Sequence, residues 1–554
     1  MNDVEGITAA SVEEPAFDED VYRAWNPDVD RAIRAGTLSS AQLHFEVFGR
    51  RERRAPFLAA PGRHHAVPLR TGDELRQPVT PPHDWWAGAA FVVRTFGGLA
   101  HLRLDGTIES AETGAVERAF AFDEWATDGE TLVLKFPPLE DSGGKTYLVR
   151  LWVRRAEARE TVQAICEPRV GDDGIVWNGE PAAAVRCVLD LRCTPPTLPG
   201  PAGITLNPLT QCAGECLHCL SRSHREKAGR LRPEWIEALR VHFRDGPGVA
   251  WCVDYATDFF RAARHRPELI ELLAAHGNSA INTDGQDVTA PALRQLFAGQ
   301  VRSIGFSCDA ASEETYAVVR KGLGRLETVL DSARLALRVR RELGLTDQPR
   351  IAMSMVVMKA NLHEAVRFVD LAAATGVDAV WFNQLWVCSE GMVGQSLMFT
   401  ATAWREQLEL ARQRGRELGI GVFNDVDLRP EQPQHDTSWC PEPWRSMVIL
   451  GNGDVLACAS PASRIGSLCE STIEEIWNGE HFQRLRRQVN SDRPPLMCVH
   501  CPVYRKPGNA DGVFLHHLLP DYDVRRDLAD ESGAYAAGFA RRFSFAAAAR
   551  HRPA

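Results

Sequence analysis

The chain carries three cysteines in one short segment whose spacing is suited to metal chemistry. Cys212, Cys216 and Cys219 form a C-x3-C-x2-C pattern soon after an extended run at 203–207. Three thiolates so close together can hold three irons of a cubane iron–sulfur cluster and leave the fourth iron open to a substrate or cofactor. A cluster that the protein ligates fully only carries electrons, so the missing fourth ligand indicates chemistry at the open iron.

A zinc site is the alternative explanation for these cysteines, because zinc proteins commonly use C-x2-C pairs with tetrahedral closure. Zinc would need a fourth ligand nearby. His218 lies between Cys216 and Cys219, but adjacent residues in a tight loop rarely bind one small ion together. We therefore favour the iron–sulfur cluster.

The segments around these cysteines predict an α/β fold. Strand-like runs alternate with amphipathic helical segments from residue 203 to about residue 420. The strands are expected at 203–208, 248–255, 278–283, 303–308, 350–358 and 379–387, and helices at 233–244, 324–344 and 362–375. Six β-α units predict a parallel sheet and, with the cysteine loop after the first strand, a partial (βα)6 TIM-like barrel. In such a barrel the reacting groups gather at the carboxyl ends of the strands.

The cysteine spacing and its place after the first strand resemble the radical S-adenosylmethionine (SAM) enzymes, here over 203–420 as the core. In this family a reduced cluster binds the amino and carboxylate groups of SAM at its open iron, and cleavage gives methionine and a 5'-deoxyadenosyl radical that abstracts hydrogen from a C–H bond. The resemblance implies a 4Fe-4S cluster and SAM as cofactors. Other segments follow in the family's order: Asn282-Thr283-Asp284-Gly285, Phe306-Ser307-Cys308-Asp309-Ala310, Val319-Arg320-Lys321-Gly322 and Lys359-Ala360-Asn361.

The resemblance implies cofactor-binding roles for individual residues. His218 precedes the third cysteine, where the family usually has an aromatic residue near the adenine. Ser307 and Asp309 match the element after the fourth strand, in which the serine meets the cofactor. Arg320 matches an arginine that can face the SAM carboxylate, a task suited to the planar guanidinium.

One segment departs from the family pattern. After the second strand the family usually carries Gly-Gly-Glu, which positions the methionine amino group, whereas this chain reads Trp-Cys-Val-Asp-Tyr-Ala at 251–256. Asp254 could replace the glutamate as a cofactor-binding residue. The loss of both glycines limits close approach of the backbone to a ligand.

A second set of cysteines, Cys440, Cys458, Cys498 and Cys501, lies near the C-terminus. An Asn-Gly turn at 452–453 predicts a hairpin over 447–458, and a helix is expected around 473–478. This pattern resembles the SPASM or twitch type of extension of radical SAM enzymes, here assigned to 421–508. The resemblance implies one auxiliary 4Fe-4S cluster fully ligated by the four cysteines, and zinc is again the alternative.

The other cysteines are expected to be small buried hydrophobes and not ligands. They are Cys166, Cys187, Cys193, Cys252, Cys308, Cys388 and Cys469.

Two modules precede the barrel. A helical pattern at 17–54 resembles a small module of bacterial proteins that handle cell-surface glycans; a helical appendage that aids docking is the alternative. A proline-rich stretch at 59–82 separates it from 85–193, where alternating apolar and polar residues predict an antiparallel β-sandwich-like domain. A second proline-rich linker at 193–203 marks the boundary to the barrel.

Length and charge limit the function further. The 554 residues suggest about three or four modules, and 44% hydrophobic with 25% charged residues is ordinary for a folded protein. A formal charge of -10 without a long Lys/Arg run argues against nucleic acid as a partner. The first 20 residues lack the features of a signal peptide, and no apolar stretch is long enough for a membrane span. A cytoplasmic location is expected, in which cysteines stay reduced.

We therefore expect a radical SAM enzyme that oxidises, epimerises or crosslinks a peptide or carbohydrate substrate and takes electrons from a donor such as flavodoxin or ferredoxin. The SPASM resemblance favours a peptide and the N-terminal module a carbohydrate. Cys388, just after the sixth strand, could return a hydrogen atom to a substrate radical as a catalytic thiol. The alternative is an inactive scaffold protein of a surface-glycan pathway. A methyltransferase is less favoured, because no cobalamin domain is recognisable.

Overall fold

The structure is a computed structural model of the chain. It divides into two compact units, residues 1–193 and 194–554. The division falls at the start of the proline-rich linker expected at 193–203. The structure describes residues 33, 65–94, 100–126, 131–158, 162–168, 176–177, 180–181, 185–187, 190–191, 194, 197–210, 212, 214–219, 229–245, 249–252, 258–276, 278–387, 390–397, 400–424, 440–491, 493–499, 501, 522–530 and 532–537.

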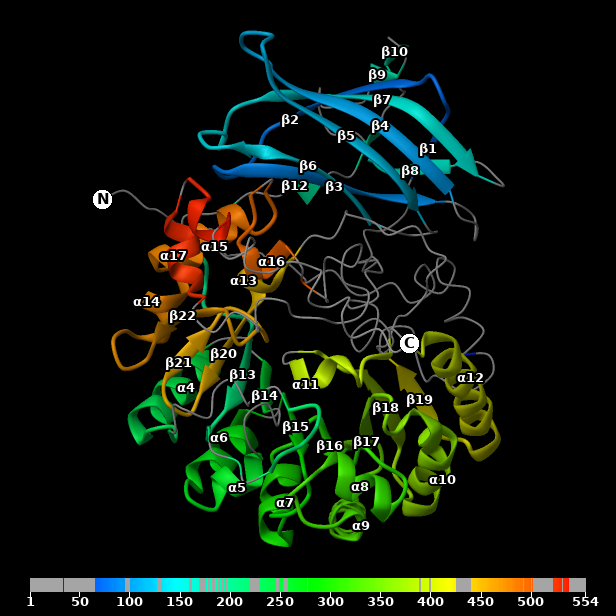
Figure 1. Ribbon diagram of the computed structural model, residues 1–554. Helices are drawn as coiled ribbons and strands as arrows, with labels where there is room; N and C mark the ends of the chain where they lie inside the picture. The colour runs from blue at the N-terminus through cyan, green and yellow to red at the C-terminus, as the bar shows by residue number, and fades with distance from the viewer. Residues whose placement is uncertain are drawn as a thin grey trace, which may run out of the picture. The chain divides into compact units, whose positions relative to one another are not determined.

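The first unit is built from two antiparallel sheets (blue to cyan in Figure 1). One sheet contains β1 (His65–Leu69), β8 (Val162–Pro168), β3 (Trp86–Arg94), β12 (Asp190–Leu191), β11 (Val185–Cys187) and β6 (Thr131–Leu139). The other has the order β10 (Glu180–Pro181), β9 (Val176–Trp177), β2 (Glu74–Val79), β7 (Tyr147–Ala158), β4 (Ala100–Ser110) and β5 (Val116–Ala126).

One apolar core joins the two sheets. Leu102 and Leu104 of β4 are buried together with Phe91 and Leu132 of the other sheet, while Arg103, between the two leucines of β4, is exposed. This period of two leaves one face of each strand for the core and the other for solvent. The region expected to be β-sandwich-like thus contains two antiparallel sheets that share one core.

The sandwich begins earlier than the sequence indicated. The stretch 59–82, expected to be a linker, contributes β1 and β2, which pair with β8 and β7. Proline is tolerated in a strand where its missing N–H is not needed by a neighbour. Strand β9 pairs with β2 only at Leu75 and Arg76, so Pro78 lies beyond the part of β2 that β9 covers.

The second unit contains a ten-stranded sheet of order β19-β18-β17-β16-β15-β14-β13-β20-β21-β22. Its strands are β13 (Gly203–Asn207), β14 (Val249–Cys252), β15 (Ser279–Thr283), β16 (Ser303–Ser307), β17 (Arg350–Val357), β18 (Ala379–Gln384), β19 (Gly421–Asn424), β20 (Ser446–Leu450), β21 (Asp454–Leu456) and β22 (Arg464–Ser467). Strands β13 to β19 each pair in parallel with the next one in the chain.

This one-way winding confirms the predicted α/β class and the partial barrel. Two details differ from the expectation of six strands. Strand β19 follows as a further parallel strand at the edge, and β20 pairs in parallel with the other side of β13. The C-terminal hairpin, confirmed as β20 and β21 with Gly453 in a left-handed turn conformation (φ 88°), therefore continues the barrel sheet.

The helices of the second unit follow the strands, and α7, α9 and α10 lie along one side of the sheet (Figure 1). Their bounds are α4 (Pro233–Asp245), α5 (Phe259–Ala263), α6 (Glu268–His276), α7 (Ala290–Ala298), α8 (Glu313–Val319), α9 (Leu326–Glu342), η3 (Leu362–Glu364), α10 (Ala365–Thr375), α11 (Glu390–Val393), α12 (Ala401–Leu418), α13 (Glu442–Arg445), α14 (Ile473–Trp477), α15 (Glu480–Gln488), α16 (Leu496–Val499) and α17 (Val524–Ala529). The helices expected at 233–244, 324–344, 362–375 and 473–478 are present.

Local sequence explains where these elements begin and end. In β17, Ile351, Met353 and Met355 are fully buried, and partly buried residues alternate with them. Helix α14 starts at a capping box, in which the Thr472 side chain accepts from the Glu475 N–H and the Glu475 side chain accepts from the Thr472 N–H. None of the described helices is long and apolar enough to cross a membrane. The helical module expected at 17–54 lies outside the described residues, apart from residue 33.

A pair of identical substitutions tests the packing of the barrel helices. Leu293 of α7 is fully buried, whereas Leu410 of α12 is 50% exposed. We expect Leu293→Ala to lower the free energy of unfolding by about 2–5 kcal/mol, because it leaves a cavity. Leu410→Ala should change it by less than about 0.5 kcal/mol. Urea denaturation followed by circular dichroism measures both, and equal losses would contradict the placement of α7.

Candidate functional site

The first cysteine set lies in the loop after β13, at the carboxyl end of the strand. Cys216 is 4% exposed, and Cys212 and Cys219 are partly buried. The Gly214 N–H donates to the Cys212 Sγ at 3.3 Å, and the Cys219 N–H donates to the Cys216 carbonyl at 3.3 Å. Cys219 lies near enough for its negative charge to raise the pKa of both Cys212 and Cys216. The three cysteines predicted to be cluster ligands are thus brought together.

Burial keeps the thiols of Cys212 and Cys216 protonated in the absence of a cation. It raises the pKa of Cys212, against which the Gly214 N–H and the positive charge of Arg261 act. It raises the pKa of Cys216 to about 12, against which the charge of Arg320 acts. Thiolates form in such a place when a metal supplies positive charge, so iron binding and proton release are coupled.

A cubane cluster and a single metal ion place different demands on their ligands. Each thiolate of such a cluster binds a different iron, so the ligands surround a volume and do not converge on one point. Within the described residues, no group of three His, Cys, Asp or Glu side chains is arranged to hold a single metal ion. The N–H group that donates to the Cys212 sulfur is of the kind that tunes the potential of iron–sulfur clusters.

Four residues predicted to bind the cofactor meet around one buried carboxylate. Asp309 is 1% exposed and has a positive φ of 59°. Its Oδ1 accepts from the Val356 N–H at 2.6 Å, and its Oδ2 lies 2.6 Å from Arg320 Nε and 3.5 Å from His218 Nε2. Arg320 Nη2 donates to the Ser307 carbonyl at 2.6 Å. His218, Ser307, Asp309 and Arg320 therefore form one cluster beside the cysteine loop.

Two other predicted residues, Asp254 and Cys388, lie outside the described residues. Near the segment of Asp254, the structure instead describes Asp258, which is 1% exposed. Its carboxylate accepts from the Thr283 hydroxyl at 2.5 Å, the Asp284 N–H at 2.9 Å and the Arg261 N–H at 3.0 Å. Asp258 thus joins the start of α5 to the end of β15.

Arg261 extends this network toward the cysteines. Its guanidinium donates to Asp284 at 2.9 Å and to Asp287 at 2.8 Å, and the charges of Arg261 and Asp284 act on Cys212. Burial and the charge of Asp284 raise the pKa of Asp258 to about 7. Asp258, Arg261 and Asp287 were not predicted from the sequence; their acidic and basic side chains near consecutive strand ends were the available signal.

The second cysteine set also comes together. Burial and, after it, the charges of Cys501, Cys498 and Cys458 raise the pKa of Cys440 far above its ordinary value. Burial raises the pKa of Cys458 to about 12, while the Ser460 N–H donates to its sulfur at 3.4 Å. The Cys501 N–H donates to the Cys498 carbonyl at 3.3 Å, which is the same turn as in the first set.

Helix α15 and Asn490, the second residue after it, hold the loop that contains Cys440. Asn490 is 2% exposed, and its side chain accepts from the Cys440 N–H at 2.8 Å and donates to the Cys440 carbonyl at 3.0 Å. One turn earlier, Arg486 Nε donates to the Pro443 carbonyl at 2.8 Å, and the guanidinium lies over the Trp477 ring at 4.5 Å. The backbone of Cys440 is therefore fixed from one side by a single amide.

Helix α17 supports the segment that contains Cys498, one of the other pair of auxiliary cysteines. Asp527 of α17 accepts from the Leu496 N–H at 2.7 Å and from the Tyr522 hydroxyl at 2.6 Å. Leu496 begins α16, which contains Cys498. The sequence analysis assigned no role to this segment, because a carboxylate that acts across about thirty residues leaves no local pattern.

The remaining cysteines agree only partly with expectation. Cys308 is fully buried, as expected of a small hydrophobe. Cys469 is exposed, so the expectation of burial was wrong for it. It lies in the turn after β22, where its sulfur is 3.9 Å from the Asn452 carbonyl oxygen.

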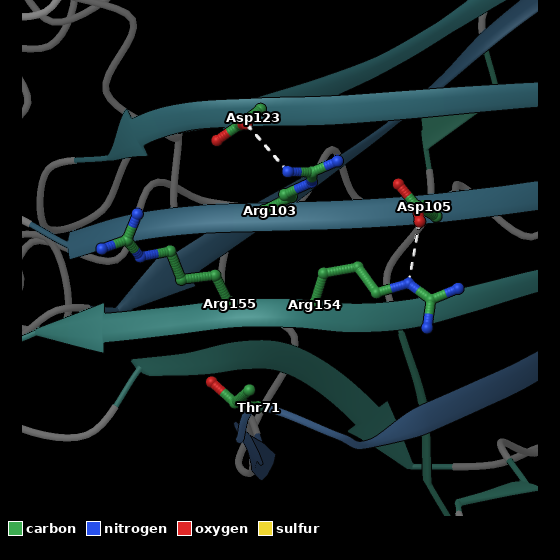
Figure 2. A pocket seen from close by; sticks show the side chains of 6 residues that line it. All are labelled: Thr71, Arg103, Asp105, Asp123, Arg154 and Arg155. Carbon is green, nitrogen blue, oxygen red and sulfur yellow. Dashed lines mark hydrogen bonds and ion pairs between the residues drawn. The ribbon is translucent and has the colours of Figure 1, made fainter.

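The sandwich carries a polar cleft of its own (Figure 2), of about 470 Å³. It is lined by Thr71, Arg103, Asp105, Asp123, Arg154 and Arg155. Arg154 pairs with Asp105 at 2.8 Å and Arg103 with Asp123 at 3.8 Å. Exposed ion pairs of this kind contribute little to stability, and the cleft lacks the cysteines that mark the other two sites.

A comparison with protein families identifies the second cysteine set. Residues 440–502 match the SPASM model, an iron–sulfur cluster-binding domain. This part of the chain is a SPASM domain. The match confirms the predicted SPASM-type extension, and for these four cysteines it favours an iron–sulfur cluster over zinc.

Solved structures give more distant likenesses. SuiB from Streptococcus suis, bound to the precursor peptide SuiA, is 14% identical with a TM-score of 0.39; the match covers 52% of this chain and 66% of SuiB, slightly less than two thirds of its length. AnSMEcpe with bound AdoMet is 15% identical with a TM-score of 0.42, covering 63% of this chain and 97% of that one. These likenesses are too distant to carry a functional argument. A search of curated proteins found no match.

The amide that holds Cys440 has a matched control in the same unit. The Asn478 side chain hydrogen-bonds to the backbone of Leu198 in the same way: it accepts from the Leu198 N–H at 2.8 Å and donates to the Leu198 carbonyl at 3.0 Å. We expect Asn490→Ala to remove the auxiliary cluster and lower bound iron and sulfide to about half. Asn478→Ala should lose comparable stability but keep its iron. Iron and sulfide analysis after anaerobic reconstitution measures this, and equal iron in both variants would contradict the role of Asn490.

Proposed function

We propose that the chain is a radical SAM enzyme that cleaves SAM reductively and abstracts a hydrogen atom from its substrate. One observation carries this proposal: a C-x3-C-x2-C loop lies at the carboxyl end of β13 in a parallel, barrel-like sheet that continues into a SPASM domain. When bound, a 4Fe-4S cluster with one open iron supplies the electron and the site for the sulfonium compound.

The chain's own residues would bind and protect this cluster. Cys212, Cys216 and Cys219 are the proposed ligands. The Gly214 N–H stabilises the charge on the Cys212 sulfur, and the low exposure of Cys216 keeps water from the ligand loop. We propose that His218 and Ser307 contact SAM, because the polar contacts around the Asp309 carboxylate join both residues to the cysteine loop.

For the substrate we propose a peptide or protein first and a carbohydrate second. A SPASM domain favours the former on the family resemblance, and the glycan-associated module expected at 17–54 favours the latter. Oxidation, epimerisation and crosslinking are the proposed outcomes, with electrons from a flavodoxin or ferredoxin in the cytoplasm. Cys388 is the proposed hydrogen donor in an epimerase, and unchanged product from Cys388→Ala would remove that role.

An inactive scaffold is the second candidate, and the altered segment after β14 favours it. The buried network of Asp258, Thr283 and Asp284 begins two residues after the segment 251–256, where the sequence departs from the family's Gly-Gly-Glu. The Asp258 carboxylate is already bonded within the fold, so it does not take the place of the family's glutamate as a cofactor ligand. The two candidates differ in whether SAM is cleaved.

Reductive cleavage distinguishes them directly. Reconstituted protein reduced with dithionite in the presence of SAM should form 5'-deoxyadenosine. Cys216→Ala should lower its formation at least about 100-fold, because the cluster loses a ligand. Cys469→Ala removes an exposed thiol and should leave the rate unchanged. Chromatography of the nucleoside product measures this.

Protein that carries iron and sulfide at both sites but forms no 5'-deoxyadenosine would contradict the enzyme and support the scaffold. Protein that binds zinc and no iron at Cys212, Cys216 and Cys219 would contradict both candidates, because the loop would then hold no iron–sulfur cluster to bind SAM.

A further inference from the structure

The cysteine loop lies against residues 319–323, which are the last residue of α8 and the turn that follows it. We name this segment the seat. The Glu215 N–H donates to the Lys321 carbonyl at 2.6 Å, and the Leu217 N–H donates to the Val319 carbonyl at 2.9 Å. Two bonds to alternate residues are the pattern of a short antiparallel strand pair. The middle residue of the bonded part of the loop is Cys216, so its backbone is fixed on both sides.

Close packing fixes the loop a second time. A Cβ placed on Gly214 would lie 2.5 Å from Leu323 Cγ and 2.8 Å from its Cδ1. Leu323 is 6% exposed, so it has little room to move away. The glycine is therefore required by space, and its absence of a side chain lets the loop approach the seat.

The seat itself is held from within the barrel. Tyr316 is fully buried, and its hydroxyl donates to the Leu323 carbonyl at 2.9 Å. Its own carbonyl accepts from the Arg320 N–H at 2.7 Å. One buried residue thus contacts the turn twice, through its side-chain hydroxyl and through its backbone carbonyl.

Arg320 points from the seat into the fold. It is 5% exposed, its Nε lies 2.6 Å from the Asp309 carboxylate, and its Nη2 donates to the Ser307 carbonyl at 2.6 Å. The positive charge of the same guanidinium also favours the thiolate form of Cys216. The side of the guanidinium formed by Nε and Nη2 is thus occupied inside the fold. This side could bind the SAM carboxylate through two parallel N–H groups only by giving up contacts made in a buried place, where an unpaired charge is costly.

We propose that the 319–323 seat positions the cluster-binding loop, and that Arg320 is a positioning residue that acts on the cluster through Cys216 instead of binding the SAM carboxylate. This rests on the proposed function for the identity of the cluster. The contacts of the seat do not depend on whether SAM is cleaved, so the two ideas can fail separately.

Gly214 and Leu323 offer a test by rescue. Gly214→Ala should lower total iron and sulfide to about half, the level of Cys216→Ala, because the loop no longer reaches the seat while the auxiliary cluster remains. Adding Leu323→Ala removes the atoms that the new methyl group meets and should restore at least about four-fifths of wild-type iron. A general loss of folding would not be restored by a second large-to-small change.

Full iron in Gly214→Ala, or no recovery in the double variant, would overturn the seat. Wild-type protein that holds iron at the auxiliary site alone would instead overturn the proposed function. All of these values come from iron and sulfide analysis with electron paramagnetic resonance, without turnover.

Arg320 is tested by separating cluster loss from SAM affinity. Arg320→Gln should at least halve the signal of the reduced core cluster or lower its reduction potential, since a positive charge near a ligand sulfur is removed. The Kd for SAM, normalised to the protein that keeps its core cluster, should change less than about threefold, and Arg320→Lys should recover part of the potential. Arg325→Gln removes a neighbouring arginine that is 75% exposed and should change neither value. An unchanged cluster signal and potential with a tenfold weaker Kd would show that Arg320 binds the carboxylate.

Discussion

The ion pair between Asp309 and Arg320 is the interaction on which the core site depends. Both side chains are almost completely buried, where an ion pair is favourable only if its remaining polar atoms also find partners. Those partners come from different elements: the Val356 N–H of β17 and the Ser307 carbonyl of β16. The left-handed backbone of Asp309 (φ 59°) is a conformation that a well-bonded surrounding can hold. Two strands, α8 and the cysteine loop therefore share one point of attachment.

The buried cysteine thiols place a second constraint on the two cysteine sites. Burial raises the pKa of Cys216 and Cys458 to about 12, so these two thiols stay protonated near neutral pH until bound metal supplies positive charge. Each set nevertheless has part of its scaffold ready: a backbone N–H on one sulfur and a tight C-x2-C turn. The protein thus fixes backbone positions in advance and leaves the charge to the metal, which couples iron binding to the order of both loops.

How much could be predicted follows from how local each signal is. The parallel strands, the hairpin turn and the cysteine spacings are patterns within a few residues, and they were found. The contacts of Asp527 with Leu496 and of Asn490 with Cys440 join distant segments, so no local pattern marks them. Strand β2 was missed because the prolines of the stretch 59–82 suggested a linker, although Pro78 lies beyond the part of β2 that β9 covers. The role of Arg320 was transferred from a family pattern, and only its bonded neighbours suggest another one.

The sheet order relates the two cysteine sets to each other. Strands β13 and β20 are adjacent and parallel, with Asn207 opposite Leu450. The core loop follows the carboxyl end of β13, whereas Cys458 follows β21, which runs back beside β20 so that Leu456 faces Val448. The auxiliary set therefore lies toward the amino end of β20. The five residues of β20 span four intervals of about 3.3 Å, or roughly 13 Å, between these ends. The two cysteine sets thus lie toward opposite ends of one pair of adjacent strands, so each set is held by its own loop at its own end of the pair.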